Sequence, residues 1–103
     1  LGLDPEQIGS VVNSGTARSH ASEYFVPRML NRDFAYNFSM QAAYKDLVNA
    51  SEACMAEALP TPVLDSATSV YKAALLKGLG RLYKGAMICV YEDLMGTRFT
   101  KKE

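Results

Sequence analysis

The chain has 103 residues, which is enough for one domain with a hydrophobic core and too few for two. Eleven basic and eleven acidic residues give a formal net charge of zero, so the composition excludes the broad basic surface of proteins that bind nucleic acids or acidic membranes. No apolar run approaches the roughly 20 residues of a membrane-spanning helix, and the first residues lack the features of a signal peptide.

Two short helices are predicted in the first third of the chain. The first, over residues 5–13, is indicated by an N-cap, a first-turn proline and a capping-box partner, which are Asp4, Pro5 and Gln7. Ser19 is a suitable N-cap for the second, over residues 21–30. Pro27 lacks an amide donor and is expected to kink or divide this second helix, before a turn at residues 31–33.

A long helix is predicted over residues 40–59, with Ser39 as its N-cap. Its apolar residues recur at three- and four-residue steps and form one stripe, composed of Met40, Ala43, Tyr44, Leu47, Ala50, Cys54 and Ala58. Successive helical residues are rotated by about 100°, so Lys45 lies off this stripe. The other residues on its polar face are Gln41, Asn49 and Glu52. This face borders either solvent or a cleft.

Two more helices complete the predicted fold. Thr61 and Pro62 provide an N-cap and a first-turn proline for a fourth helix that ends near Gly78. Its apolar stripe comprises Leu64, Ala67, Tyr71, Ala74, Leu75 and Gly78. A last helix is predicted over residues 83–94 and ends at Gly96; its apolar positions are Met87, Val90 and Leu94. The short connections indicate antiparallel neighbours around one core, and therefore a compact all-α bundle of about five helices.

Residues 1–96 are expected to form this helical domain and residues 97–103 a frayed C-terminal tail. Cys54 and Cys89 fall at apolar helix positions, so buried free thiols in a reducing compartment such as the cytoplasm are expected, rather than a disulfide or a metal site. His20 is the one histidine, and no carboxylate or cysteine at helical spacing completes a metal-ligand set around it.

The segment Gly78-Leu-Gly80 resembles the start of a dinucleotide-binding loop. It lacks the third glycine, and a predicted helix rather than a strand precedes it, so a helix C-cap is the better interpretation.

The order of several short segments resembles that of one protein family. These segments are Phe38-x-Met40, Lys45-Asp46-Leu47, Leu59-Pro60-Thr61-Pro62, Val70-Tyr71 and Gly78-Leu-Gly80. Over residues 2–95 they are similar to the C-terminal all-α domain of the β-hydroxyacid dehydrogenases. That family comprises relatives of 3-hydroxyisobutyrate dehydrogenase and of the tartronate semialdehyde and glyoxylate reductases, and is more distantly related to 6-phosphogluconate dehydrogenase.

The resemblance implies one part of a two-domain oxidoreductase that transfers a hydride between NAD or NADP and the hydroxyl carbon of a short β-hydroxyacid. A Rossmann domain and the general acid–base lysine are expected N-terminal to this chain. No catalytic residue is then expected within the chain, which alone would be inactive. Its first residue is Leu rather than Met, which favours such a fragment. The family also implies homo-oligomers that assemble through this domain.

The resemblance also assigns roles to individual residues. Phe38 would lie against the nicotinamide and substrate region, Lys45 would reach toward the cofactor, and Asp46 would shape the substrate side. Asn49 is added to the substrate side because it lies one turn beyond Lys45 on the same helix face. Ser19 matches a serine that is frequent in the family and is assigned to the substrate side. No metal ligand is implied.

Departures from the family pattern leave an alternative open. After Gly80 the family usually has acidic residues and then a serine, at positions that are occupied here by Arg81, Tyr83 and Gly85. The alternative is a non-catalytic helical interaction module. Its adaptable surface would consist of the aromatic cluster Tyr24, Phe25, Phe34, Tyr36 and Phe38 and of Met29, Met40, Met55 and Met87. The aromatic cluster favours packing over base stacking.

Overall fold

The computed structural model describes residues 2–35 and 38–102. They form five α-helices and one 3-10 segment, which are α1 Pro5–Ser14, α2 His20–Leu30, α3 Met40–Ala56, α4 Pro62–Leu76, η1 Lys84–Met87 and α5 Ile88–Met95. This described part of the chain contains no strand, and an isolated antiparallel β-bridge joins Ser39 to Tyr83. The predicted all-α domain of five helices is therefore confirmed.

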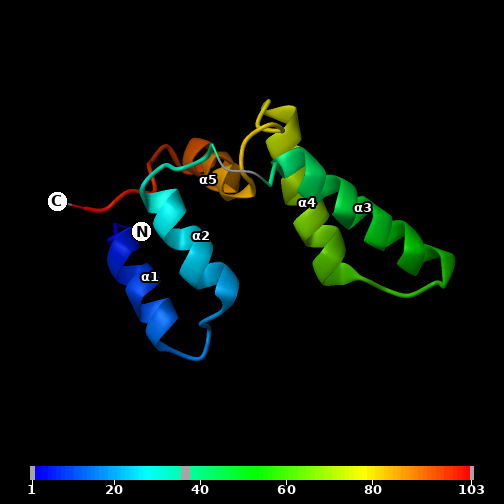
Figure 1. Cartoon of the computed structure of the whole chain (residues 1–103), viewed down its shortest axis with the longest axis horizontal. Coiled ribbons are helices and arrows are strands. Elements are labelled where there is room, and N and C mark those ends of the chain that lie inside the picture. The colour runs from blue at the N-terminus through cyan, green and yellow to red at the C-terminus, as the bar shows by residue number, and fades with distance from the viewer. Residues whose placement is uncertain (1, 36–37, 103) are drawn as a thin grey trace.

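The helices form two antiparallel pairs, α1 with α2 and α3 with α4, and α5 lies between the pairs (Figure 1). Both α2 and α3 contact η1, which packs against α5. The domain is elongated, with extents of 50 × 33 × 26 Å and a radius of gyration of 15.0 Å. A compact domain of this length has a radius of gyration near ~13 Å, so the two pairs spread away from η1 and α5 rather than closing over each other.

The core lies where the start of α3, the end of α4, η1 and α5 meet. Its buried members are Met40, Ala74, Ala86 and Val90. The predicted stripes reach this core only at one end of the α3/α4 pair, and Ala50 on α3 and Ala58 beyond its end are exposed. These positions are exposed because the far end of the pair projects beyond η1 and α5 (Figure 1).

Two helix boundaries differ from the sequence prediction. α2 continues through Pro27, so of the two expected outcomes a division of the helix is wrong and a kink stays a prediction; the ring of Pro27 is exposed, and the helix loses one backbone donor. α3 ends at Ala56, earlier than predicted, because Ala58 adopts a φ of 55° and the amides of Ala58 and Leu59 bond back to the last turn. This Schellman ending usually carries glycine, so alanine at the left-handed position concealed it.

The ends of the last helices also refine the prediction. α4 begins at Pro62 as predicted, but the Thr61 hydroxyl does not cap its backbone and donates to the Asp65 carboxylate at 3.2 Å instead. Gly78 has a φ of 82° directly after the C-cap Lys77, which confirms that the segment starting at Gly78 ends the helix. The last predicted helix starts as the 3-10 segment η1 and continues as α5, which ends as expected at Gly96 with a φ of 64°.

The C-terminal tail is docked, so the expectation that it frays is wrong. The Phe99 amide donates to the Glu92 carboxylate at 2.7 Å, and the Lys102 amide donates to the Asp4 carboxylate at 2.9 Å. Glu92 also accepts two bonds from the Arg32 guanidinium, at 2.7 and 3.0 Å. The tail therefore joins α5 to the start of α1, through side chains that are far apart in the sequence.

The two thiols are free, as predicted, but both are partly exposed rather than buried. Cys89 Sγ lies 3.8 Å from Arg32 Nη2, and partial burial raises the pKa of this thiol. Among the residues that the structure describes, no helix combines the length and the apolar character needed to cross a membrane.

Candidate functional site

An open groove lies on one face of α3, near the N-terminus of this helix. It has a volume of about 610 Å³ and is lined by Ser39, Gln41, Ala42, Tyr44, Lys45, Val48, Asn49 and Leu75. The residues from α3 share one face because they recur at one-, three- and four-residue steps along a helix of 3.6 residues per turn. Leu75 comes from α4 and closes one side.

The loop that follows α4 holds the first turn of α3 in place. The Met40 amide donates to the Leu82 carbonyl at 2.8 Å. The Gln41 amide donates to the Gly80 carbonyl at 2.9 Å. Ser39 caps the next amide through its hydroxyl at 3.1 Å, as predicted. Because the amides of the first turn are bonded within the chain, this helix terminus has no free amide for a phosphate group.

Two of the predicted ligand-binding residues, Lys45 and Asn49, line the groove. Asp46 is exposed about 100° around the helix from Lys45 and is not among the lining residues. Within residues 2–35 and 38–102, no carboxylate forms an ion pair with Lys45. Its ammonium group is therefore available to an anionic or hydroxyl-bearing ligand.

A second cation lies beside Phe38, which precedes α3 and is 39% exposed. Lys84 Nζ is 5.0 Å from the centroid of the Phe38 ring and 4.7 Å from that of Phe25. The Lys84 amide also donates to the Phe38 carbonyl at 3.2 Å. Sequence reasoning missed Lys84 because its two aromatic neighbours are remote in the chain and a single lysine forms no pattern.

Ser19 is not among the residues that line the groove; it precedes α2 in the loop after α1. Its hydroxyl accepts a bond from the Ser22 amide and its own amide donates to the Ser22 hydroxyl, both at 2.9 Å. This reciprocal pair is a capping box. Ser22 also donates to the Asn13 side chain at 2.6 Å, which joins the start of α2 to α1.

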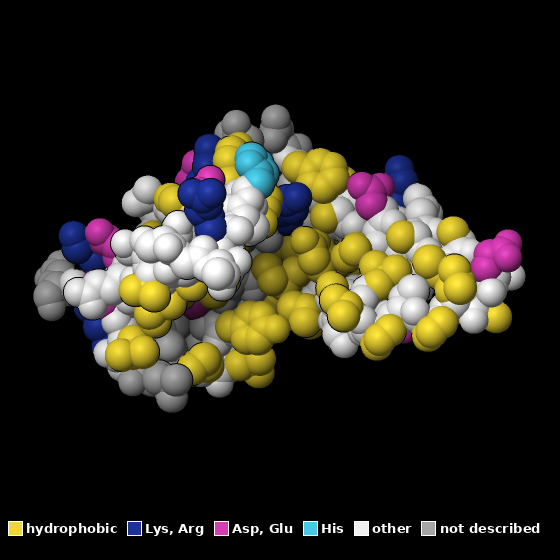
Figure 2. Space-filling view, turned by 90° about the horizontal axis from the view of Figure 1, so that it is seen from below, with side chains coloured by type: hydrophobic (Ala, Val, Ile, Leu, Met, Phe, Trp, Pro, Cys, Tyr) yellow, Lys and Arg dark blue, Asp and Glu magenta, His cyan; other side chains and the backbone are white. Residues whose placement is uncertain are grey.

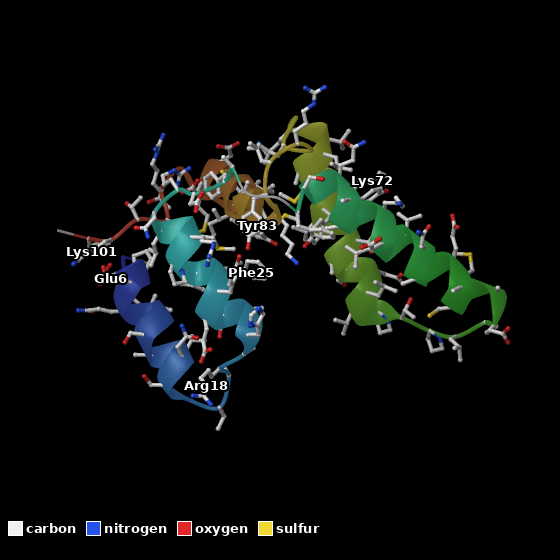
Figure 3. All side chains as sticks on the ribbon, in the orientation of Figure 1. Glu6, Arg18, Phe25, Lys72, Tyr83 and Lys101 are labelled. Atoms are coloured by element: carbon white, nitrogen blue, oxygen red, sulfur yellow. The ribbon has the colours of Figure 1, made fainter. Side chains whose placement is uncertain are left out.

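The aromatic cluster packs α2 against the segment that leads into η1. The ring of Phe25 lies 5.5 Å from that of Tyr83 and 5.3 Å from that of Tyr24 (Figure 3). Tyr83 is only 2% exposed. His20 stacks on Tyr24 at 5.5 Å. These contacts confirm a packing function for this part of the cluster, whereas Tyr36 lies outside the described residues.

The groove has the chemistry of a binding surface. Lys45 offers three donors, and the Asn49 carboxamide offers donors and an acceptor, beside the apolar side chains of Val48 and Leu75. In the described ranges, no group of three or more His, Cys, Asp and Glu side chains could hold a metal ion. The arrangement suits a polar or anionic molecule that lies along the first turns of α3.

Comparison with known proteins identifies the family. Residues 1–91 match the family model described as NAD-binding of NADP-dependent 3-hydroxyisobutyrate dehydrogenase. The chain therefore belongs to this family of β-hydroxyacid dehydrogenases, and the resemblance seen in its sequence motifs is confirmed.

Two curated relatives cover much of the chain. It is 33% identical over 96 residues to 2-(hydroxymethyl)glutarate dehydrogenase from Eubacterium barkeri, an alignment that covers 92% of this chain and 32% of that protein. It is 37% identical over 86 residues to mitochondrial 3-hydroxyisobutyrate dehydrogenase from Drosophila melanogaster, which covers 77% of this chain and 26% of that protein. The chain thus spans about a third or less of the length of these relatives.

Proposed function

We propose that the chain is the substrate-side and oligomerisation domain of an NAD(P)-dependent oxidoreductase that acts on a short β-hydroxyacid. The observation that supports this function is the groove on α3, which brings Lys45 and Asn49 onto one face with Ser39, the residue that follows the exposed Phe38. In this proposal, a nicotinamide-binding domain and the general acid–base lysine belong to a segment N-terminal to the chain. The chain alone is then inactive.

The side chains fit a minor part of a nicotinamide dinucleotide site. The Lys45 ammonium suits a ribose hydroxyl or a phosphate oxygen, and the Phe38 ring excludes water from one side of the nicotinamide. When bound, the nicotinamide supplies the carbon that accepts or donates the hydride. Because the amides at the start of α3 are occupied, recognition of the pyrophosphate falls to the N-terminal domain.

The substrate side of the proposed site lies on α3, beyond Lys45 toward the C-terminus of the helix. Asn49 presents its carboxamide one turn beyond Lys45, where it can bond a hydroxyl or carboxylate of the hydroxyacid. Asp46 does not line the groove; the family resemblance assigns it to the substrate side, where its carboxylate would accept a bond from a substrate hydroxyl. The family resemblance assigns Ser19 to the substrate side as well. The free thiols fit a protein of a reducing compartment.

Self-association is supported by the apolar surface of the domain. Large exposed apolar side chains include Leu3, Ile8, Val11, Met55, Leu59, Val63, Leu76, Leu94 and Met95. Figure 2 shows hydrophobic side chains that continue from the middle of the molecule along the α3/α4 pair. Apolar area of this kind is usually covered by another domain or subunit.

The interaction-module alternative loses part of its predicted surface. Met40 is fully buried, and Met29 and Met87 are partly buried, so only Met55, at 73%, is widely exposed among the four methionines proposed for it. An adaptable methionine surface therefore does not form.

The proposed function is tested on the complete protein that contains this domain. A panel of short β-hydroxyacids with one or two carboxylates is assayed with NAD and with NADP, for wild type, Lys45→Ala and Asp46→Ala. Lys72→Ala is the control, because Lys72 is exposed on α4 and does not line the groove (Figure 3). We expect turnover by wild type and a fall of about tenfold or more in kcat/KM for Lys45→Ala, which corresponds to ~1.4 kcal/mol.

The control is expected to match wild type in this assay. No turnover of any hydroxyacid, or a folded Lys45→Ala variant as active as wild type, would contradict the proposed function and favour the interaction module.

A further inference from the structure

Lys84 is a half-buried cation held between two aromatic rings, one of which, Phe38, is assigned to the proposed site. Its Nζ lies 4.7 Å from the Phe25 centroid and 5.0 Å from the Phe38 centroid. In the described part of the chain no carboxylate forms an ion pair with it, although four other basic side chains have such partners. The ring faces stabilise the ammonium but leave its charge without a counter-ion.

The backbone around Lys84 fixes this cation relative to Phe38. The Lys84 amide is bonded to the Phe38 carbonyl, and the preceding Tyr83 amide is bonded to the Phe34 carbonyl at 2.8 Å. Tyr83 is buried and its ring packs on Phe25. The lysine stem therefore starts from a rigid point, and its charge lies beside Phe38, which the proposed function places against the nicotinamide and substrate region.

We propose that Lys84 binds a second carboxylate of the substrate, so that the enzyme prefers hydroxyacids with two carboxylates over those with one. This inference rests on the proposed function. The first carboxylate and the reacting hydroxyl are held by the rest of the site, including Asn49, while a carboxylate at the other end of the molecule neutralises the Lys84 ammonium. An ammonium group that is partly removed from water gains more from such a partner than an exposed one.

The test is made on the complete protein and distinguishes the effect of the Lys84 charge from the effect of its packing between the two rings. Lys84→Met keeps an apolar stem between the two rings and removes the charge, whereas Lys84→Arg keeps the charge. Lys72→Met removes an exposed charge on α4 and is the matched control. KM and kcat are measured for a hydroxyacid with two carboxylates, for one with one carboxylate, and for the cofactor.

We expect Lys84→Met to raise KM for the two-carboxylate substrate by about tenfold or more while kcat changes by less than about twofold. KM for the one-carboxylate substrate and for the cofactor should stay unchanged, and Lys84→Arg should restore most of the loss. Equal effects on both substrates, or no effect on either, would overturn the assignment and leave the proposed function standing. A rise in the KM of the cofactor alone would assign Lys84 to a phosphate instead.

Wild type provides an independent check that does not depend on the folding of a variant. Its KM for the two-carboxylate substrate should rise more steeply with ionic strength than its KM for the one-carboxylate substrate, because salt screens the additional ion pair. The same dependence of KM on ionic strength for both substrates would contradict the assignment of Lys84 to a second carboxylate. Absence of turnover with every hydroxyacid would overturn the proposed function, and this assignment with it.

Discussion

The ring of Tyr83 occupies the space into which a side chain at position 85 would point: a Cβ on Gly85 would lie 2.9 Å from Tyr83 Cε2 and 3.1 Å from Cδ2. Tyr83 is buried at the joint between α2 and η1, so its ring has little room to move. The residues at positions 83 and 85 are therefore sterically coupled in this chain. A large ring at position 83 requires glycine at position 85.

Substitution at Gly85 should reveal this coupling. We expect Gly85→Ala to lower the free energy of unfolding by ~1–3 kcal/mol, because the added methyl group overpacks against the ring. In a Tyr83→Ala background the same substitution should cost much less. Urea denaturation of the chain measures both changes. Gly15→Ala is the control, since a Cβ there makes only an ordinary contact at 3.5 Å; the same cost at Gly85 in both backgrounds would disprove the coupling.

The end of α3 offers a stabilising substitution. Ala58 has a φ of 55°, a conformation that glycine adopts without the steric penalty of a Cβ. We expect Ala58→Gly to raise the free energy of unfolding by ~0.5–1 kcal/mol. Ala53→Gly, at an exposed position inside α3, should lower it by a similar amount. Thermal or chemical denaturation of the two variants gives opposite signs if the left-handed ending is correct, and two losses if α3 continues past Ala58.

The ion pair of Arg32 and Glu92 predicts a dependence of stability on pH. The hydrogen bonds from Arg32, supported by the Phe99 amide, hold the pKa of the Glu92 carboxyl below its ordinary value. A carboxyl whose pKa is lowered by folding stabilises the folded state above its unfolded pKa, near ~4.3, and this contribution is lost as the pH falls through the folded pKa. Glu92→Gln should therefore be less stable than wild type at neutral pH, and the difference should shrink on acidification.

Denaturation curves between pH ~5 and ~2 check this prediction. Glu52→Gln is the control, because Glu52 is exposed on α3 and has no ion pair among the described residues. If the difference between wild type and Glu92→Gln stays constant with pH, the carboxylate does not stabilise the fold through this network.

Two substitutions at Ser19 distinguish its observed role as a helix cap from its proposed role in substrate binding. Ser19→Ala removes the side-chain acceptor of the capping box and should lower the free energy of unfolding by about 1 kcal/mol. Ser19→Asp keeps an acceptor and should restore most of that stability. A rise in KM for a hydroxyacid in Ser19→Asp, at unchanged stability of the complete protein, would show that position 19 lies close to the substrate.

The parts of the fold that depend on local rules were predictable from the sequence. Asp4 and Ser39 cap α1 and α3 as expected, and Gly78 and Gly96 end α4 and α5. Each of these features depends on a few neighbouring residues whose preferences are strong. The end of α3 was missed because Ala58 carries no such preference for the left-handed conformation.

Features that depend on remote contacts could not be predicted in this way. The groove face with Lys45 and Asn49 follows from helix rotation alone, but the position of Lys84 depends on Phe25, which is far away in the sequence. The docked tail likewise depends on an acceptor, Asp4, at the opposite end of the chain. Periodicity contains no information on such pairs, since it reports which face of an element is apolar and not what packs against it.

The hydrogen bonds from the Met40 and Gln41 amides to the loop after α4 also affect how readily the first turn of α3, beside the groove, unfolds. Helices generally fray from their first turn, where amides lack partners. Here those amides are held by carbonyls of Leu82 and Gly80, so the first turn of α3 and the loop are expected to exchange their amide hydrogens as one cooperative unit. The first turn of α3 is therefore expected to open only when its hydrogen bonds to this loop break. Because the loop follows α4, we expect the groove to become ordered only after both helices of the α3/α4 pair have formed.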